Sequence, residues 1–198
     1  MERIFYTVIE YLQAGGPVML PILLVSMLMW FLIIDRVLFM RRLFFKNIPR
    51  TQAGKYVQLN KRPEQKFRGV NASLVREFLS HRTGNRELDD YILDEVVLKM
   101  SSSVEKYLTL ITVLSRVAPL LGLLGTVTGM MVTFDVITVF GTGNARAMAG
   151  GISEALITTQ TGLLVSIPGL YMSGFLQKRS INLKHRIAAT GIYLKRFI

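Results

Sequence analysis

Three long apolar runs interrupt an otherwise polar and basic chain. They extend from Tyr11 to Ile34, from Val117 to Phe134 and from Ala155 to Gln177, and none of them contains a formal charge. A membrane-spanning helix needs about 20 predominantly apolar residues. Each run therefore predicts one transmembrane helix, and together they predict an all-α membrane protein with three spans. No small-residue cleavage site follows the first run, which predicts a retained helix rather than a signal peptide.

The basic residues predict the orientation of these spans. Of the 24 Lys and Arg residues, only Arg3 precedes the first run and only Arg146 lies between the second and the third. Lys and Arg concentrate in cytoplasmic segments of membrane proteins. This pattern predicts an outer N-terminus and a cytoplasmic C-terminus.

The long segment between the first two runs predicts helices that extend beyond the membrane. Proline and glycine punctuate residues 49–69, but Pro119 is the only proline from 86 to 134. A helix that begins near 86 and continues through the second span would be about 70 Å long, more than twice the hydrocarbon thickness. The basic tail is expected to extend the third span similarly, with an amphipathic helix on the membrane surface as the alternative. The predicted order is an outer tail (1–10), a first span (11–34), a cytoplasmic region (35–106), a second span (107–134), an outer loop (135–154), a third span (155–177) and a cytoplasmic helix (178–198).

Composition narrows the chemistry. Hydrophobic residues make up 51% of the chain and charged residues 19%, with no cysteine and two histidines. These numbers exclude disulfides and thiol catalysis, and they argue against a metal site within one chain. No nucleotide-binding motif and no Ser/His/Asp arrangement is present, so we expect neither an enzyme nor a cofactor. The net charge of +11 is interpreted as a signal of topology rather than of nucleic-acid binding.

Small and hydroxyl residues recur at helical spacing in the second and third runs. In the second run one column is Thr112, Pro119, Thr126 and Thr133, and a second is Ser115, Gly122 and Gly129. In the third run the series is Thr159, Gly162, Ser166, Gly169 and Ser173. Steps of three, four and seven place such residues on one face of a helix.

Two compatible interpretations of these stripes remain open. Glycines allow helices to approach closely, as Gly125-x-x-x-Gly129 would. The residues assigned to packing are Gly122, Gly125, Gly129, Gly162 and Gly169. The hydroxyl groups favour a partly polar lumen shared by several subunits. The residues assigned to that pathway are Thr126, Thr133, Thr159, Ser166 and Glu154.

Glu154 stands at the outer start of the third run. With Ser153 it could serve the first turn of a helix, or it could act beside a polar lumen. No run carries a carboxylate, histidine or lysine near its middle. A proton relay normally requires such a group. Either the chain moves no protons, or another subunit supplies the titrating group.

Two segments resemble the signatures of a known family. Residues 118–130 (APLLGLLGTVTGM) and 150–168 (GGISEALITTQTGLLVSIP) resemble the second and third spans of the MotA/TolQ/ExbB proton-channel family. The resemblance covers about 100–178 and is greatest to the ExbB type, with the TolQ type as the alternative. Residues 50–85 match nothing.

The resemblance implies a function and partners. It implies an inner-membrane homopentamer whose lumen holds helices of an ExbD-like single-span partner with an intramembrane Asp. Proton flow would drive a TonB-like protein that spans the periplasm, and so energise outer-membrane uptake; lipids are the other expected contacts. Thr126 and Thr159 match the family's pore threonines, and Glu154 matches its third-span glutamate. The alternatives are a TolQ-like subunit of the Tol-Pal system and a non-conducting oligomeric scaffold.

Overall fold

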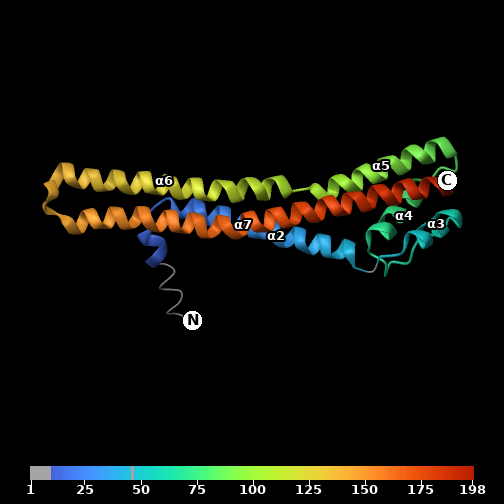
Figure 1. The fold of residues 1–198 in the computed structure, drawn as a ribbon, viewed down its shortest axis with the longest axis horizontal. Helices are drawn as coiled ribbons and strands as arrows, with labels where there is room; N and C mark the ends of the chain where they lie inside the picture. Colours follow the sequence, from blue (N-terminus) through green and yellow to red (C-terminus); the bar gives the residue numbers. More distant parts are fainter. Residues whose placement is uncertain (1–9, 46) are drawn as a thin grey trace. The chain divides into compact units, whose positions relative to one another are not determined.

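The computed structural model describes residues 10–45 and 47–198, and these residues form helices and connections without a strand (Figure 1). The elements are α2 (Met19–Phe44), α3 (Arg50–Gln58), α4 (Val70–His81), α5 (Arg86–Glu105), α6 (Leu108–Phe140), η1 (Gly141–Gly143), α7 (Ala145–Leu194) and η2 (Lys195–Phe197). Among the described residues, three helical stretches are long and apolar enough to cross a membrane: Met19–Phe44, Arg86–Gly143 and Ala145–Phe197. The all-α class with three candidate spans, two of them long, is confirmed.

The chain divides into two compact units. The first comprises Met1–Ile33, of which residues 10–33 are described, and Leu110–Ser173. The second comprises Ile34–Thr109 and Gly174–Ile198.

In the first unit, α6 and α7 lie side by side along a seam of small residues (Figure 1). A Cβ atom placed on Gly162 would lie 2.8 Å from the carbonyl oxygen of Ala118. The two backbones therefore approach each other as closely as glycine allows. Serine and threonine hydroxyls add polar links, such as Thr112 to Ser173 at 2.6 Å.

The first apolar helix begins later than the sequence predicted. The run from 11 to 34 was expected to form one span with a turn or kink at Gly15–Gly16, but α2 begins only at Met19, after a turn at Gly15–Val18. Gly16 has φ +66°, a left-handed conformation that ends a right-handed helix and suits glycine. The chain is helical again from 10 to 14, before this turn.

The connection between α6 and α7 is shorter than the predicted outer loop of 135–154. It consists of η1 and Asn144, whose side-chain oxygen accepts a hydrogen bond from the Ala147 amide at 3.1 Å. An asparagine in this position caps the free amides of a helix start. Ser153 and Glu154 therefore lie inside α7 rather than in its first turn, and the interpretation of this pair as a helix start is wrong. Where the membrane surface meets these helices stays a prediction.

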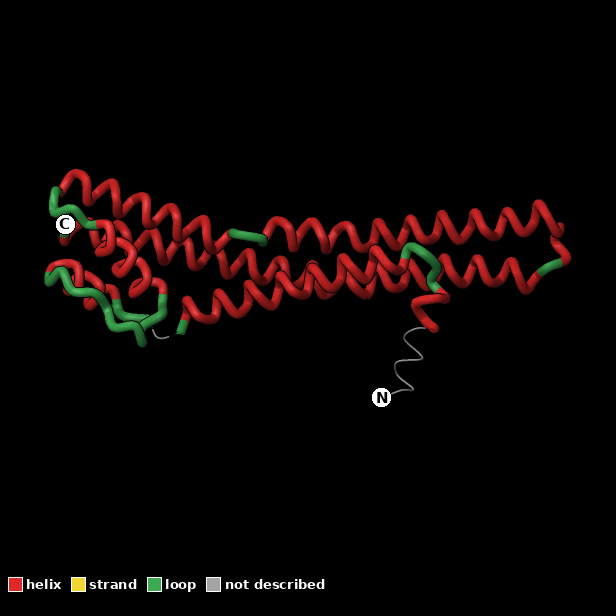
Figure 2. Tube along the Cα trace, turned by 180° about the vertical axis from the view of Figure 1, so that it is seen from behind, coloured by secondary structure: helices red, strands yellow, loops and turns green. Residues whose placement is uncertain are grey.

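In the second unit, the helix expected from residue 86 is interrupted at Lys106–Tyr107 (Figure 2). Tyr107 has φ +66°, which no α-helix accommodates. In an unbroken helix the Tyr107 amide would donate to the carbonyl oxygen of Ser103. Here Arg36 donates to that oxygen instead, from Nη1 at 3.2 Å. A side chain from a distant segment thus caps the end of α5.

Polar side chains also fasten the rest of the second unit. The buried Asn71 of α4 donates to the carbonyl of Ile48 at 2.8 Å and accepts from Thr190 of α7 at 3.0 Å. Beyond the end of α7, Lys195 of η2 pairs with Asp90 and Asp94 of α5 at 3.0 and 2.8 Å. These contacts hold α4 against α7 and α5 against η2.

Asp89 organises the turn between α4 and α5. It is 1% exposed, and its carboxylate accepts hydrogen bonds from the amide and hydroxyl of Thr83, the amide of Gly84 and the guanidinium of Arg82. Burial alone raises the pKa of Asp89, but these four donors lower it by more. The pKa therefore lies below its usual value.

Candidate functional site

Two of the predicted pathway residues meet at one backbone carbonyl. The hydroxyl of Thr159 on α7 donates to the carbonyl oxygen of Gly122 on α6 at 3.0 Å. In α6 the same oxygen is the helical acceptor for the amide of Thr126. Thr126 donates its own hydroxyl to Leu123 at 2.6 Å, and both threonines are half-buried. The structure therefore brings Thr126 and Thr159 together on a flank of the seam that the chain itself does not fully cover.

Two other predicted pathway residues lie inside the seam. Thr133 is 4% exposed and donates to the carbonyl of Gly129 on its own helix at 3.1 Å. Ser166 is 3% exposed and donates across the seam to the carbonyl of Ser115 at 2.8 Å. Each hydroxyl already has an acceptor within one chain. In a single chain Ser166 links α7 to α6 by a hydrogen bond, and Thr133 packs against Gly151 of α7. The role of these two residues in a lumen stays a prediction.

All the glycines assigned to packing are buried in the seam. Gly122 faces Thr159 and Gly162, while Gly125 faces the side chain of Thr158. Gly129 faces Ala155 and Gly151, and Gly169 faces Met29 and Ser115. At each of these positions a Cβ atom would press on backbone or on a packed side chain. Such contacts support the packing interpretation.

Glu154 lies on a different flank of α7. Thr159 follows it by five residues, which corresponds to about 140° around a helix. The carboxylate of Glu154 lies against Gly16, the residue with a left-handed backbone before α2. Glu154 is half-buried, and no hydrogen bond or ion pair to its carboxylate is found among the described residues. The structure therefore separates Glu154 from the pair formed by Thr126 and Thr159.

Sequence analysis missed the contact between the N-terminal turn and Glu154. The Gly-Gly-Pro sequence at 15–17 signals a turn, but it does not say what the turn contacts. The interruption at Tyr107 and its cap Arg36 were also missed. Both depend on contacts between residues far apart in the sequence.

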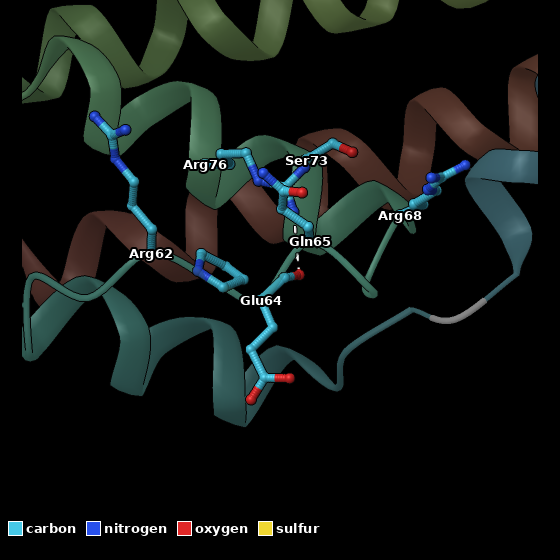
Figure 3. Close-up of a pocket in the computed structure, with 7 residues that line it drawn as sticks. Arg62, Glu64, Gln65, Arg68, Ser73 and Arg76 are labelled. Carbon is cyan, nitrogen blue, oxygen red and sulfur yellow. Dashed lines mark hydrogen bonds between the residues drawn. The ribbon is translucent and has the colours of Figure 1, made fainter.

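The second unit carries a surface cavity of about 590 Å³ that is rich in arginine (Figure 3). Arg76 donates to the carbonyls of Glu64 and Phe67 at 3.3 and 3.1 Å, and so closes the loop before α4. The side chains of Arg62 and Arg68 point away from each other in Figure 3. The arginines do not converge on one point, as they would in an anion-binding site. Arg76 instead stabilises the loop before α4 through its hydrogen bonds to two backbone carbonyls.

Comparison with known proteins identifies the family. Residues 63–189 match the model of the MotA/TolQ/ExbB proton channel family. The matched range includes α4 to α6 and most of α7, together with Thr126, Thr159 and Glu154. It also includes residues 63–85, for which the sequence motifs had indicated no resemblance. The chain belongs to this family, which is a family of transport and channel proteins rather than of enzymes.

Individual relatives are named for biopolymer transport. The chain is 33% identical over 119 residues to biopolymer transport protein ExbB of Xanthomonas campestris; the match covers 60% of this chain and 44% of the relative. It is 31% identical over 195 residues to the ExbB-like protein 1 of Synechocystis, over 94% of this chain and 76% of the relative. It is 28% identical over 188 residues to ExbB of Neisseria meningitidis, and this match covers 84% of this chain and 85% of the relative. The match thus spans less than half of the Xanthomonas relative.

Proposed function

We propose that this chain is the ExbB-like subunit of a motor driven by the proton motive force in the bacterial inner membrane. Several copies, five in the arrangement we favour, surround the helices of an ExbD-like partner whose intramembrane Asp titrates. The motor acts on a TonB-like protein and energises outer-membrane uptake. The N-terminus lies in the periplasm and the C-terminus in the cytoplasm.

The observation that carries this proposal is the position of the two threonines beside the Gly122 carbonyl, which accepts the hydroxyl of Thr159 and, within α6, the backbone amide of Thr126. Both hydroxyls lie on a flank that remains partly open in one chain, where a second helix or water can reach them. A threonine hydroxyl does not titrate in the physiological range, but it donates and accepts hydrogen bonds and can hold a water beside a carboxylate. Each proton that passes inward releases roughly 2.3 kcal/mol per 100 mV of membrane potential, besides the contribution of the pH difference.

The exposed surface of the first unit supports a membrane-embedded oligomer. Large apolar side chains stand out from each of its long helices, among them Met27 (73% exposed), Leu120 (62%) and Leu164 (62%). Such residues on a spanning helix face lipid or a neighbouring subunit.

The test is proton flux in vesicles that contain the chain and its single-span partner. We expect Thr159→Val and Thr126→Val each to reduce flux at least tenfold, because valine keeps the shape but offers no hydroxyl. Thr128→Val is the matched control. Its hydroxyl bonds to its own helix, at Leu124 and Gly125, as that of Thr126 does, but it lies about 160° around α6 from Thr126.

Assembly must be measured on the same samples by native mass spectrometry. If Thr126→Val and Thr159→Val both conduct like the control, the pathway assignment is wrong. Should Gly125→Leu then abolish assembly, the non-conducting scaffold would be the better description. Co-purification of a TonB-like or a TolA-like protein distinguishes the ExbB role from the TolQ role.

A further inference from the structure

The segment before α2 covers one flank of α7 in the first unit. Gly16 lies against the carboxylate of Glu154, and the Cβ position of Gly15 is 3.2 Å from Cγ2 of Ile157. The hydroxyl of Tyr11 lies 3.5 Å from that of Thr161. Glu154, Ile157 and Thr161 follow each other at helical spacing of three and four. A continuous stretch of this flank is therefore in contact with residues 11–16.

Glycine is required at position 16 for two separate reasons. Its φ of +66° is a conformation that other residues rarely adopt. In addition, a Cβ atom at this position would overlap the carboxylate of Glu154. The second reason distinguishes Gly16 from Gly141, which shares its backbone conformation. Gly141, in the connection after α6, has a φ of +63° but nothing within 4 Å of its Cβ position.

The carboxylate at this contact is not held by other described residues. No described hydrogen bond or ion pair fixes it, and its own helix packs on α6 through another face. Without the turn at Gly15–Gly16, several rotamers would be open to it, and water would reach it more easily. The contact with the Gly15–Gly16 turn therefore restricts the orientation of the Glu154 carboxylate.

We propose that the Gly15–Gly16 turn is a positioning element for Glu154, which holds the carboxylate against α7 and restricts its access to water. This inference rests on the proposed function and extends it, by placing Glu154, one of the pathway residues predicted from the sequence, at the outer end of the proton pathway. The segment before the turn then controls that pathway, because any displacement of the segment uncovers Glu154.

The first test measures the access of water to Glu154 in the full chain in lipid nanodiscs, without partner or proton flow. A water-soluble carbodiimide with a small amine converts accessible carboxyl groups to amides, and peptide mass spectrometry reads the rate at Glu154. We expect Gly16→Ala to raise this rate at least threefold and Gly141→Ala to leave it unchanged. Equal rates in the two variants would overturn the proposal.

Two further variants keep the test informative if Gly16→Ala folds poorly. Tyr11→Ala loosens the same segment without touching the turn, and is expected to raise the rate as well. Tyr171→Ala, at an exposed position of α7, is its control and should not. If Tyr11→Ala and Tyr171→Ala give the same rate, the segment does not shield Glu154.

A rescue experiment tests positioning in the vesicle assay. Glu154→Asp shortens the side chain by one methylene, which leaves room for a Cβ atom at position 16. We expect Gly16→Ala to lower proton flux at least fivefold, and Gly16→Ala with Glu154→Asp to recover at least half of it. A double variant no better than Gly16→Ala alone would count against positioning.

The two proposals fail separately. If Glu154→Ala conducts normally, Glu154 is not in the pathway, although the labelling contrast can still show that the turn covers it. If flux depends on Glu154 but labelling does not respond to Gly16→Ala, the pathway stands and the role of the turn is wrong.

Discussion

Replacement of Arg36 by alanine is expected to destabilise the protein strongly, although most surface arginines can be removed at little cost. Arg36 is 7% exposed in the second unit. Its guanidinium donates to the carbonyl of Ser103 at 3.2 Å and lies 4.8 and 5.1 Å from the ring centres of Phe39 and Tyr107. It also pairs with Asp35 at 2.8 Å.

The magnitude follows from these contacts. A hydrogen bond from a charged donor contributes about 1.5–3 kcal/mol, and its loss leaves the Ser103 carbonyl without this partner. Each cation–π contact adds about 0.5–1 kcal/mol. The ion pair adds little, because the Asp35 side chain is 49% exposed and water screens it. We therefore expect Arg36→Ala to lower the free energy of unfolding by about 3 kcal/mol, and Arg36→Lys by about half as much, because lysine keeps the charge but not the planar fork.

The assay is unfolding of the full chain in mixed micelles, followed by circular dichroism as the denaturing detergent is increased. Arg42→Ala is the control, because Arg42 is exposed in the same helix. We expect the control to lie within about 0.5 kcal/mol of the unsubstituted chain. If Arg36→Ala were as stable as Arg42→Ala, the claim that Arg36 caps α5 at the interruption would be refuted.

Two further substitutions test the turn at Asp89 and the seam between α6 and α7. Asp89→Asn should lower the free energy of unfolding by about 2–3 kcal/mol near neutral pH, because the asparagine NH2 group is a donor and would face the donors that bind the carboxylate. The pKa of Asp89 is lowered in the folded state, so its stabilising contribution is complete above the ordinary value of about 3.9 and is lost as pH falls through the folded value. Unfolding measured from neutral to acidic pH should therefore be less pH-dependent in Asp89→Asn, and an unchanged slope would contradict this. Gly162→Ala should cost about 1–3 kcal/mol through overpacking, whereas Gly150→Ala, with open space at its Cβ position, should be neutral or stabilising; equal thermal stability of the two would contradict the close approach at the seam.

The spans could be predicted from the sequence because the energetics of membrane insertion depend on local apolar length. The interruption at Tyr107 could not, because neither glycine nor proline marks it. A tyrosine in the left-handed region costs about 1–2 kcal/mol. It persists here because Arg36 supplies both a donor for Ser103 and a cation beside the ring. Such a break depends on a partner 67–71 positions away in the chain, and local propensity carries no information about that partner.

The start of α7 shows a different limit. Asn144 is a strong helix cap by residue type, yet the apolar run that predicted the third span begins only at Ala155. Hydropathy marks the part of a helix that can lie in lipid, not the helix itself. The turns from Ala145 to Glu154, which are rich in alanine and glycine, are helical because the cap and the seam with α6 support them.

The seven-residue repeat in α6 explains why sequence spacing grouped residues that the structure separates. A straight α-helix turns by about 20° per heptad against a strict repeat of seven. From Thr112 to Thr133 the column therefore rotates by about 60°, which carries Thr133 under α7 and leaves Thr126 at the edge of the seam. The exposures agree, since Thr133 is buried and Thr126 is half-buried. One column of the sequence repeat therefore has two environments: Thr133 packs in the seam, and Thr126 lies on a partly open flank. On that flank, Thr159 of α7 donates to the Gly122 carbonyl.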